Sequence, residues 1–309
     1  MDNRDINLNT NIGRLIIENP IITASGTFGF GREYEEFMDI ANIGAISVKG
    51  LTLKPRKGNK SPRIAETVGG MLNSVGLENP GVEYFIDKEL PYLKDKNITI
   101  IANISGNTIE EYCEMAARID KSRCDAIEMN ISCPNVKRGG VAFGTDKDMV
   151  YRITKSVRDS TEKPLIVKLS PNVTDIKEIA LMAEKAGADG LSLINTLLGM
   201  AIDIKTKKPI LRNNVGGLSG PAIKPIALRM VWEVAQVVKI PIIGMGGIMN
   251  ITDVIEFLLA GASAVAIGTG NLVNPRLTVE LLVELKKYMQ KNNIKDVSEI
   301  IGKLEIYSS

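Results

Sequence analysis

Short runs of apolar residues recur along this chain and alternate with longer segments whose apolar residues follow the spacing of a helix. Short runs that are apolar throughout are typical of parallel strands, which helices cover on both faces of the sheet. Eight repeats of a strand and a helix predict an α/β fold, a single (β/α)8 TIM barrel. The predicted strands are at residues 21–25, 45–49, 99–103, 126–130, 165–168, 190–195, 241–245 and 264–268.

The segments outside these repeats predict additions to the barrel. Residues 6–17 read as an N-terminal hairpin with its turn at 9–11, and we expect this hairpin to close the barrel floor. The connections at 51–81 and 196–219 exceed the usual loop length, and loops of that size are usually functional. We therefore expect long active-site loops after strands 2, 4 and 6. No linker rich in Pro, Gly or Ser divides the chain, so we expect residues 1–309 to form one domain.

Two helix starts carry the residue spacing of a capping box, Thr108 with Glu111 and Asp175 with Glu178. In the helix after Asp175, the apolar residues recur at helical spacing and predict one buried face. That face consists of Ile176, Ile179, Ala180 and Ala183.

Composition narrows the class of protein. The 38 basic and 36 acidic side chains give a formal charge of +2, so nothing points to nucleic acid or an anionic membrane as a partner. The N-terminus does not read as a signal peptide, and no apolar stretch is long enough to span a bilayer. The 3 cysteines are not clustered, which argues against a disulfide framework and favours a reducing cytoplasm. Without histidine they cannot complete a four-ligand metal site, so no metal is expected.

The absence of histidine also restricts acid–base chemistry. Proton transfer near neutral pH must fall to Cys, Lys, a carboxylate, Tyr or a cofactor. The segment Asn-Ile-Ser-Cys-Pro-Asn at 130–135 follows a predicted strand and places Cys133 in the loop beyond it. Cys133 is therefore predicted to be a general base or a nucleophile. Cys113 and Cys124 are expected to be inert packing residues.

Polar residues or glycines end all eight predicted strands, where the side chains of a barrel converge on the active face. They are Ser25, Lys49, Asn103, Asn130, Lys168, Asn195, Gly246 and Gly268. Glycines after the last two strands are typical of a phosphate site, because they let backbone N–H groups approach an anion. The two lysines are open to two interpretations, a Schiff-base nucleophile or a cation that stabilises negative charge on a bound ring or carboxylate. The segment 73–79 combines short polar residues with glycine, which expose backbone N–H groups and predict a carboxylate cradle.

Two nucleotide-binding patterns are missing from the sequence. There is no G-x-G-x-x-G after a strand and no G-x-x-x-x-G-K-[ST]. A redox reaction in this chain would therefore need a cofactor held without a Rossmann unit, such as FMN in the barrel.

Over essentially its whole length the chain resembles class 1 dihydroorotate dehydrogenases, and within them the class 1B catalytic subunit. The resemblance rests on four segments: 130–135, the loop GGVAFGTD at 139–146, NTLLGMAID at 195–203 and GGLSGPAIKP at 216–225. It implies oxidation of (S)-dihydroorotate to orotate in de novo pyrimidine biosynthesis. In that reaction the substrate gives a hydride from C6 to FMN, and Cys133 removes the C5 proton.

The resemblance also implies a site for each ligand, with one FMN per chain. FMN contacts are implied for Ser25, Lys49, Gly50, Asn103, Asn130, Lys168, Ile194, Gly220, Gly246, Gly247, Gly268 and Thr269. Substrate contacts are implied for Lys49, Asn73, Ser74, Val75, Gly76, Leu77, Asn130, Asn195 and Thr196.

Class 1B membership implies a partner subunit carrying FAD and a [2Fe–2S] cluster, which passes the electrons to NAD⁺. The implied assembly is a homodimer of catalytic chains within a heterotetramer. Alternatives are a class 1A enzyme that reduces fumarate, a related flavin-dependent pyrimidine dehydrogenase, a Schiff-base aldolase that uses Lys168, and a non-catalytic sensor of pyrimidine or FMN.

Overall fold

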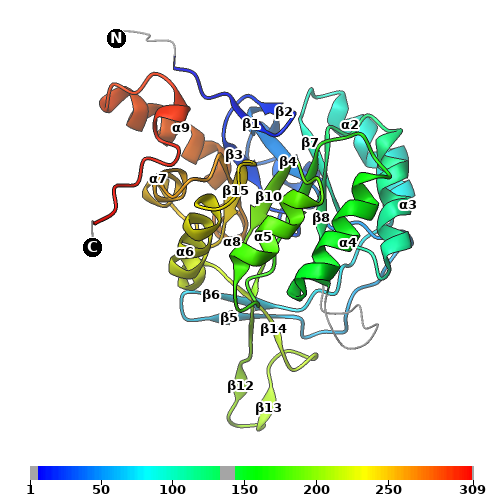
Figure 1. The fold of residues 1–309 in the computed structure, drawn as a ribbon. Helices are drawn as coiled ribbons and strands as arrows, with labels where there is room; N and C mark the ends of the chain where they lie inside the picture. The colour runs from blue at the N-terminus through cyan, green and yellow to red at the C-terminus, as the bar shows by residue number, and fades with distance from the viewer. Residues whose placement is uncertain (1–5, 133–142, 308–309) are drawn as a thin grey trace.

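Eight parallel strands close into a barrel at the centre of the molecule (Figure 1). The computed structural model describes residues 6–132 and 143–307. Around the barrel the order is β3, β4, β7, β8, β9, β10, β15 and β16, and β16 pairs with β3 to close it. The strands are β3 (Ile21–Thr23), β4 (Ala45–Ser47), β7 (Ile100–Ile104), β8 (Ala126–Asn130), β9 (Leu165–Lys168), β10 (Gly190–Leu193), β15 (Ile242–Met245) and β16 (Ala264–Ile267). The predicted (β/α)8 barrel is confirmed.

Helices cover the outside of this barrel, as Figure 1 shows for α3 to α7. Their bounds are α1 (Val82–Tyr84), α2 (Leu90–Lys94), α3 (Ile109–Asp120), α4 (Lys147–Arg158), α5 (Ile176–Lys185), α6 (Lys224–Ala235), α7 (Ile251–Leu259), α8 (Thr269–Val273) and α9 (Leu277–Lys291). A π-helical segment, Phe85–Glu89, joins α1 to α2. Single 3-10 turns occupy Arg32–Tyr34, Ile40–Asn42, Phe143–Thr145, Pro221–Ile223 and Val297–Glu299. In the described ranges, no helix combines the length and the apolar character needed to cross a membrane.

The buried face predicted for α5 is confirmed, and the capping box predicted at its start is not formed. Asp175 accepts a hydrogen bond from the backbone N–H of Lys177, at 2.8 Å. Glu178 instead lies 3.3 Å from Lys147 of α4. The carboxylate of Glu178 thus bridges two neighbouring helices and does not cap its own.

Only one of the two hydrogen bonds of the predicted capping box at Thr108 is formed. The Thr108 hydroxyl accepts from the Glu111 N–H at 3.2 Å, as expected. The Glu111 carboxylate, however, accepts from the backbone and side-chain N–H groups of Asn107, at 2.6 and 2.8 Å. Asn107 offers two donors to the Glu111 carboxylate, whereas Thr108 offers only its backbone N–H. The carboxylate therefore bonds to Asn107, the residue before the N-cap.

The N-terminal hairpin closes one end of the barrel, as predicted, but its turn lies elsewhere. β1 (Thr10–Ile12) pairs with β2 (Leu15–Ile17), so the turn falls at residues 13–14 and not at 9–11. Gly13 takes a φ of +60° there, which suits a tight turn. Ile12, Leu15 and Ile17 form one cluster with buried residues in and next to the barrel strands. Burial of such side chains contributes roughly 1.5–3 kcal/mol each.

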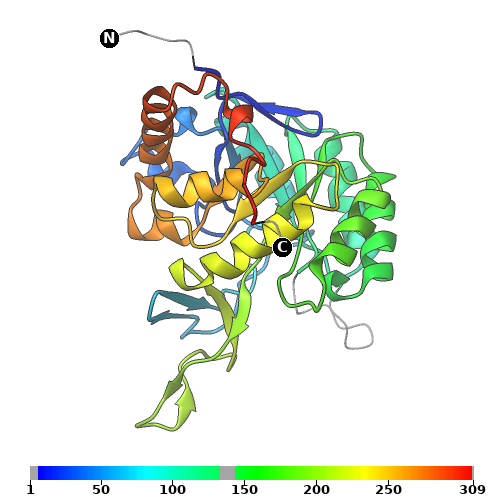
Figure 2. The ribbon, with the colours of Figure 1, turned by 60° about the vertical axis from the view of Figure 1, so that its left-hand side comes forward.

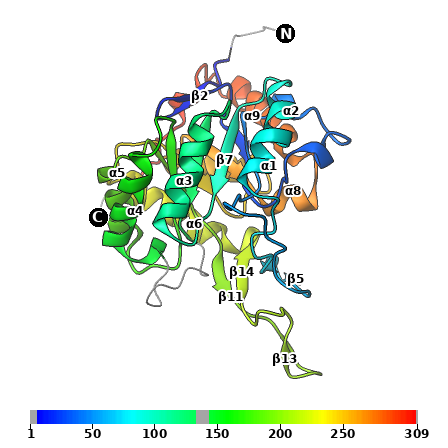
Figure 3. The ribbon, with the colours of Figure 1, turned by 90° about the vertical axis from the view of Figure 1, so that its right-hand side faces the viewer.

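The two longest connections meet at the opposite end of the barrel and form one antiparallel sheet, the roof sheet. Its strand order is β11 (Leu197–Gly199), β14 (Gly216–Ser219), β6 (Gly70–Asn73) and β5 (Ile64–Thr67). From it a thin arm, β12 (Ile202–Asp203) and β13 (Lys208–Pro209), extends away from the barrel in all three ribbon views (Figures 1, 2 and 3). The excursions after the second and sixth barrel strands therefore build a single structure.

Candidate active site

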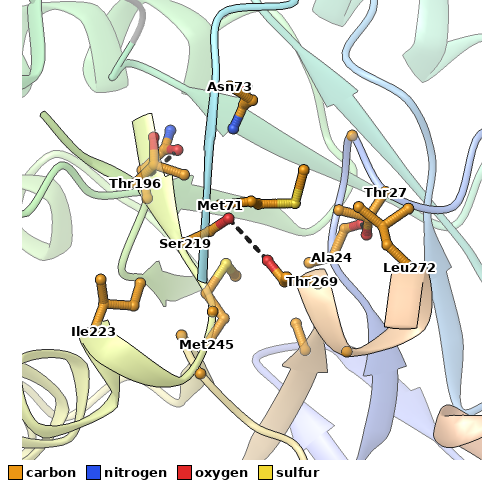
Figure 4. A pocket seen from close by; sticks show the side chains of 18 of the residues that line it. Ala24, Thr27, Met71, Asn73, Thr196, Ser219, Ile223, Met245, Thr269 and Leu272 are labelled. Atoms are coloured by element: carbon orange, nitrogen blue, oxygen red, sulfur yellow. Dashed lines mark hydrogen bonds between the residues drawn. The ribbon is translucent and has the colours of Figure 1, made fainter. Parts of the chain in front are cut away.

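A cavity lies between the carboxyl ends of the barrel strands and the roof sheet. Figure 4 shows side chains from both reaching into it, with the hydroxyls of Ser219 and Thr269 facing each other near its centre. The Thr269 hydroxyl donates to Ser219 Oγ at 2.8 Å and so joins the start of α8 to the roof sheet. Met71 from β6 enters the cavity from the roof, and Met245 from β15 enters from the barrel.

Eight of the twelve residues predicted to contact FMN line this cavity, together with four of those predicted to hold substrate. The first group is Ser25, Lys168, Ile194, Gly220, Gly246, Gly247, Gly268 and Thr269. The second is Asn73, Val75, Asn195 and Thr196. The cavity thus gathers residues from the barrel rim and from the roof, which are far apart in the sequence.

One of the remaining predicted residues, Asn130, is hydrogen-bonded to a residue that lines the cavity. Asn195 Nδ2 donates to Asn130 Oδ1 at 3.1 Å, and the Ser132 N–H donates to the same oxygen at 3.2 Å. The Tyr112 hydroxyl of α3 donates to the Asn130 carbonyl at 2.6 Å and holds the end of β8 from outside the barrel. Asn73 Nδ2 lies 3.4 Å from the Gly217 carbonyl across the roof sheet.

The other predicted site residues do not line the cavity. A Cβ placed on Gly50 would lie 3.1 Å from a methyl group of Leu77 and 3.2 Å from Asn103 Oδ1, so these three residues are neighbours. Lys49 is half-buried, and its backbone N–H donates to the Gly29 carbonyl at 2.9 Å. The remaining two, Ser74 and Gly76, follow β6 in the roof connection. Cys133 lies outside the described residues.

Glu128, in the middle of β8, is a buried acid that sequence reasoning missed. It is 3% exposed, and its carboxylate points into the barrel interior. Oε1 accepts from Ser192 Oγ at 2.6 Å, and Oε2 accepts from Asn103 Nδ2 at 2.5 Å and from Ser47 Oγ at 3.0 Å. Lys168 Nζ lies 3.9 Å from Oε2. The signal in the sequence was a single carboxylate inside an otherwise apolar strand.

The surroundings of Glu128 favour the charged form of its carboxyl group. Burial of Glu128 by itself favours the neutral acid, but the positive charge of Lys168 and the three hydrogen bonds outweigh it and lower the pKa of the carboxyl group. Lys168 is 4% exposed, and its ammonium group also donates to Ser25 Oγ at 3.2 Å. The Lys168 ammonium group thus lines the barrel side of the cavity, and Glu128 in the barrel interior holds it there.

The loop after β15 is shaped by two consecutive glycines with positive φ, +131° at Gly246 and +78° at Gly247. A Cβ on Gly247 would lie 2.8 Å from the Lys224 side chain and 2.9 Å from the Gly220 carbonyl. Asp253 holds the following residues, because its carboxylate accepts from the N–H groups of Met249 and Asn250. Backbone conformation and close packing thus require glycine here.

The polar groups around the cavity fit a flavin that carries a phosphate. Among the described residues, the backbone N–H groups of Gly246, Gly247 and Thr269 have no hydrogen-bond acceptor, and free N–H groups in such loops bind anions. Asn103 Oδ1 is buried and has no partner in the described part of the chain, so it can accept a hydrogen bond from a ring N–H. Lys168, which lines the cavity, adds a cation that would stabilise negative charge on a bound ring.

The barrel and its cavity define the chain as a (β/α)8-barrel enzyme, because such enzymes bind their ligands at the carboxyl ends of the strands and phosphate in the last two loops. A family model described as Dihydroorotate dehydrogenase matches residues 7–289. The chain belongs to the dihydroorotate dehydrogenase family.

Similar proteins cover the chain almost end to end. The chain is 58% identical over 299 residues to the dihydroorotate dehydrogenase B (NAD(+)), catalytic subunit, of Alkaliphilus metalliredigens (strain QYMF). This match covers 97% of the present chain and 99% of the relative. The corresponding proteins of Thermoanaerobacter sp. (strain X514) and Geobacter metallireducens (strain ATCC 53774 / DSM 7210 / GS-15) are 57% and 54% identical. These matches cover 97% of this chain and 100% and 98% of the relatives.

Proposed function

We propose that this chain oxidises (S)-dihydroorotate to orotate with one bound FMN, in de novo pyrimidine biosynthesis. The observation that carries the proposal is the cavity at the barrel rim, which brings together eight residues of the expected flavin site and four of the expected substrate site. The family match over residues 7–289 supports the same reaction. The proposal treats residues 1–309 as one FMN-binding barrel domain.

The residues have separate tasks in this reaction. A bound flavin supplies the acceptor for the hydride that leaves C6. Cys133 accepts the proton from C5, so that the C5–C6 bond becomes double. Asn130 and Asn195 hold the pyrimidine ring with the roof residues 73–77, and Lys168 provides positive charge against the negative charge that develops beside the ring.

We further propose that electrons leave through a partner subunit. The relatives are named dihydroorotate dehydrogenase B (NAD(+)), catalytic subunit, and this name supports a second subunit and NAD⁺ as the final acceptor. The proposed partner carries FAD and a [2Fe–2S] cluster, and the proposed assembly is a catalytic homodimer within a heterotetramer. A cytoplasmic location is proposed from the dispersed cysteines.

The test is the visible spectrum of the purified protein, followed anaerobically as dihydroorotate is added. We expect the absorption bands of an oxidised flavin, which bleach on addition of dihydroorotate and stay unchanged with dihydrouracil. Bleaching by dihydrouracil alone would identify a different pyrimidine dehydrogenase. A protein that stays colourless after reconstitution with FMN would contradict the proposal, and borohydride trapping of a carbonyl substrate on Lys168 would then identify an aldolase.

The electron acceptor is tested separately. The isolated chain, reduced by dihydroorotate, is mixed either with fumarate or with NAD⁺ and the co-expressed partner. We expect reoxidation by NAD⁺ only when the partner is present. Rapid reoxidation by fumarate would show a class 1A enzyme.

A further inference from the structure

The carboxylate of Glu128 contacts two residues that the proposed function assigns to flavin binding, Asn103 and Lys168. Its contacts come from β4, β7, β9 and β10, so it links four strands across the inside of the barrel. It does not line the cavity. Its effect on a ligand must therefore pass through its neighbours.

The first effect concerns the orientation of the Asn103 amide. An ionised carboxylate only accepts hydrogen bonds, so the amide nitrogen of Asn103 must face Glu128. The amide oxygen then faces Gly50, where it is fully buried and without a partner in the described residues. Glu128 in this way leaves the Asn103 oxygen, on the side of Gly50, as a free hydrogen-bond acceptor.

The second effect concerns the position of the Lys168 ammonium group. Burying a charged group away from water is costly unless an opposite charge lies close to it. Glu128 supplies that charge at 3.9 Å, and the remaining contact, Ser25 Oγ, is neutral. Ser47 and Ser192 keep the carboxylate in place from two other strands.

We propose that Glu128 is a positioning residue for the flavin, which orients Asn103 as a hydrogen-bond acceptor and holds the Lys168 ammonium group at the edge of the cavity. This inference rests on the proposed function. It assigns Glu128 no contact with the substrate or with FMN.

The test compares Glu128→Gln with the wild type in two backgrounds, the natural chain and Lys168→Met. The dissociation constant of FMN is measured by titrating apoprotein and following flavin fluorescence, and the absorption spectrum of the bound flavin is recorded. Gln keeps the size of Glu128, but it carries no charge and can donate as well as accept. The control is Glu89→Gln, which removes a carboxylate that is also buried and paired, with Arg32 at 2.8 Å, outside the barrel interior.

We expect Glu128→Gln to weaken FMN binding at least about tenfold and to shift the flavin absorption bands, since a buried charge-assisted contact is lost. In the Lys168→Met background the same change should have a smaller effect on the constant, because only the part that acts through Asn103 remains. Glu89→Gln should bind FMN like the wild type.

Three outcomes would overturn the inference: wild-type affinity and spectrum in Glu128→Gln, an equal effect of the change in both backgrounds, or an equal loss in Glu89→Gln. If Glu128→Gln does not fold, Ser192→Ala loosens the carboxylate without removing its charge. We then expect a loss of FMN affinity of about threefold or more, and wild-type affinity would overturn the inference. A wild-type chain that binds no FMN would instead contradict the proposed function, and this inference with it.

Discussion

The side-chain nitrogen of Asn195 lies 3.1 Å from the side-chain oxygen of Asn130 and donates a hydrogen bond to it. Asn130 ends β8, and Asn195 follows β10. Because the oxygen of Asn130 is occupied by this bond and by the Ser132 N–H, its amide nitrogen is the group left for a ligand. The two asparagines thus act as one unit at the barrel rim.

Asn195→Ala should therefore weaken orotate binding more than FMN binding. Loss of the bond frees the Asn130 amide to rotate, and we expect the dissociation constant of orotate to rise about tenfold. The measurement is a titration of the oxidised holoenzyme with orotate, read from the flavin spectrum. The control is Asn11→Ala, which removes an exposed amide on the N-terminal hairpin. Unchanged orotate affinity in Asn195→Ala would contradict the role of this pair.

Cys133→Ala should retain FMN and slow flavin reduction by dihydroorotate at least about 10²-fold near neutral pH, the usual contribution of a positioned base. Anaerobic stopped-flow absorbance measures the rate. Cys113→Ala changes a half-buried thiol in α3 and should leave the rate unchanged. A wild-type rate in Cys133→Ala would remove Cys133 as the base.

Gly247→Ala should weaken FMN binding and lower the melting temperature. The added methyl group meets both a positive φ and atoms of Lys224 and Gly220 within 3 Å. Gly302→Ala is the matched control, because Gly302 also has a positive φ, +70°, but nothing lies within 4 Å of its Cβ position. The difference between the two variants isolates the effect of crowding in the loop after β15. An equal loss of FMN affinity in Gly302→Ala would contradict a specific role of the loop after β15 in FMN binding.

The stability of the fold should depend on pH through Asp120. Its carboxylate accepts from the Thr161 hydroxyl at 2.6 Å and from the N–H groups of Glu162 and Lys163, and these bonds lower the pKa of the carboxyl group. The native state then binds fewer protons, so the contribution to stability is complete above the ordinary pKa of about 3.9 and is lost as the pH falls through the lowered value.

We therefore expect Asp120→Asn to lower the free energy of unfolding by roughly 1–2 kcal/mol at pH 7 and by much less near pH 2. Urea unfolding at both pH values measures the difference. Asp159→Asn, an exposed carboxylate on a surface pair with Lys155, should change stability by less than about 0.5 kcal/mol. A loss that is the same at both pH values would show that the charge of Asp120 is not involved.

Cys124 should resist alkylation in the native protein. Burial raises the pKa of the Cys124 thiol to about 12, so almost no thiolate is present at pH 8. Iodoacetamide labelling followed by mass spectrometry should find Cys124 modified in urea and unmodified in buffer. Equal labelling in both would show that this part of the barrel opens readily.

The sequence by itself determined the repeating architecture of this protein. Apolar runs at residues 126–130 and 165–168 predicted strands where the structure has them, because a strand covered on both faces must be apolar along its length. The polar residues at strand ends, such as Lys168 and Asn195, could be identified as site residues for the same reason. They interrupt a pattern that burial otherwise requires.

Only the tertiary structure decided which distant groups meet. The pairing of β6 with β14, which brings Asn73 and Met71 over the barrel, joins segments that carry no local signal for each other. In the sequence, Glu128 is one residue within a predicted apolar strand. In the structure, its partners come from four other strands of the closed barrel. The same holds for a predicted helix cap, because the Glu178 carboxylate pairs with Lys147 of the neighbouring helix α4. Local patterns record what a segment must bury, whereas hydrogen-bond and charge partners depend on barrel closure.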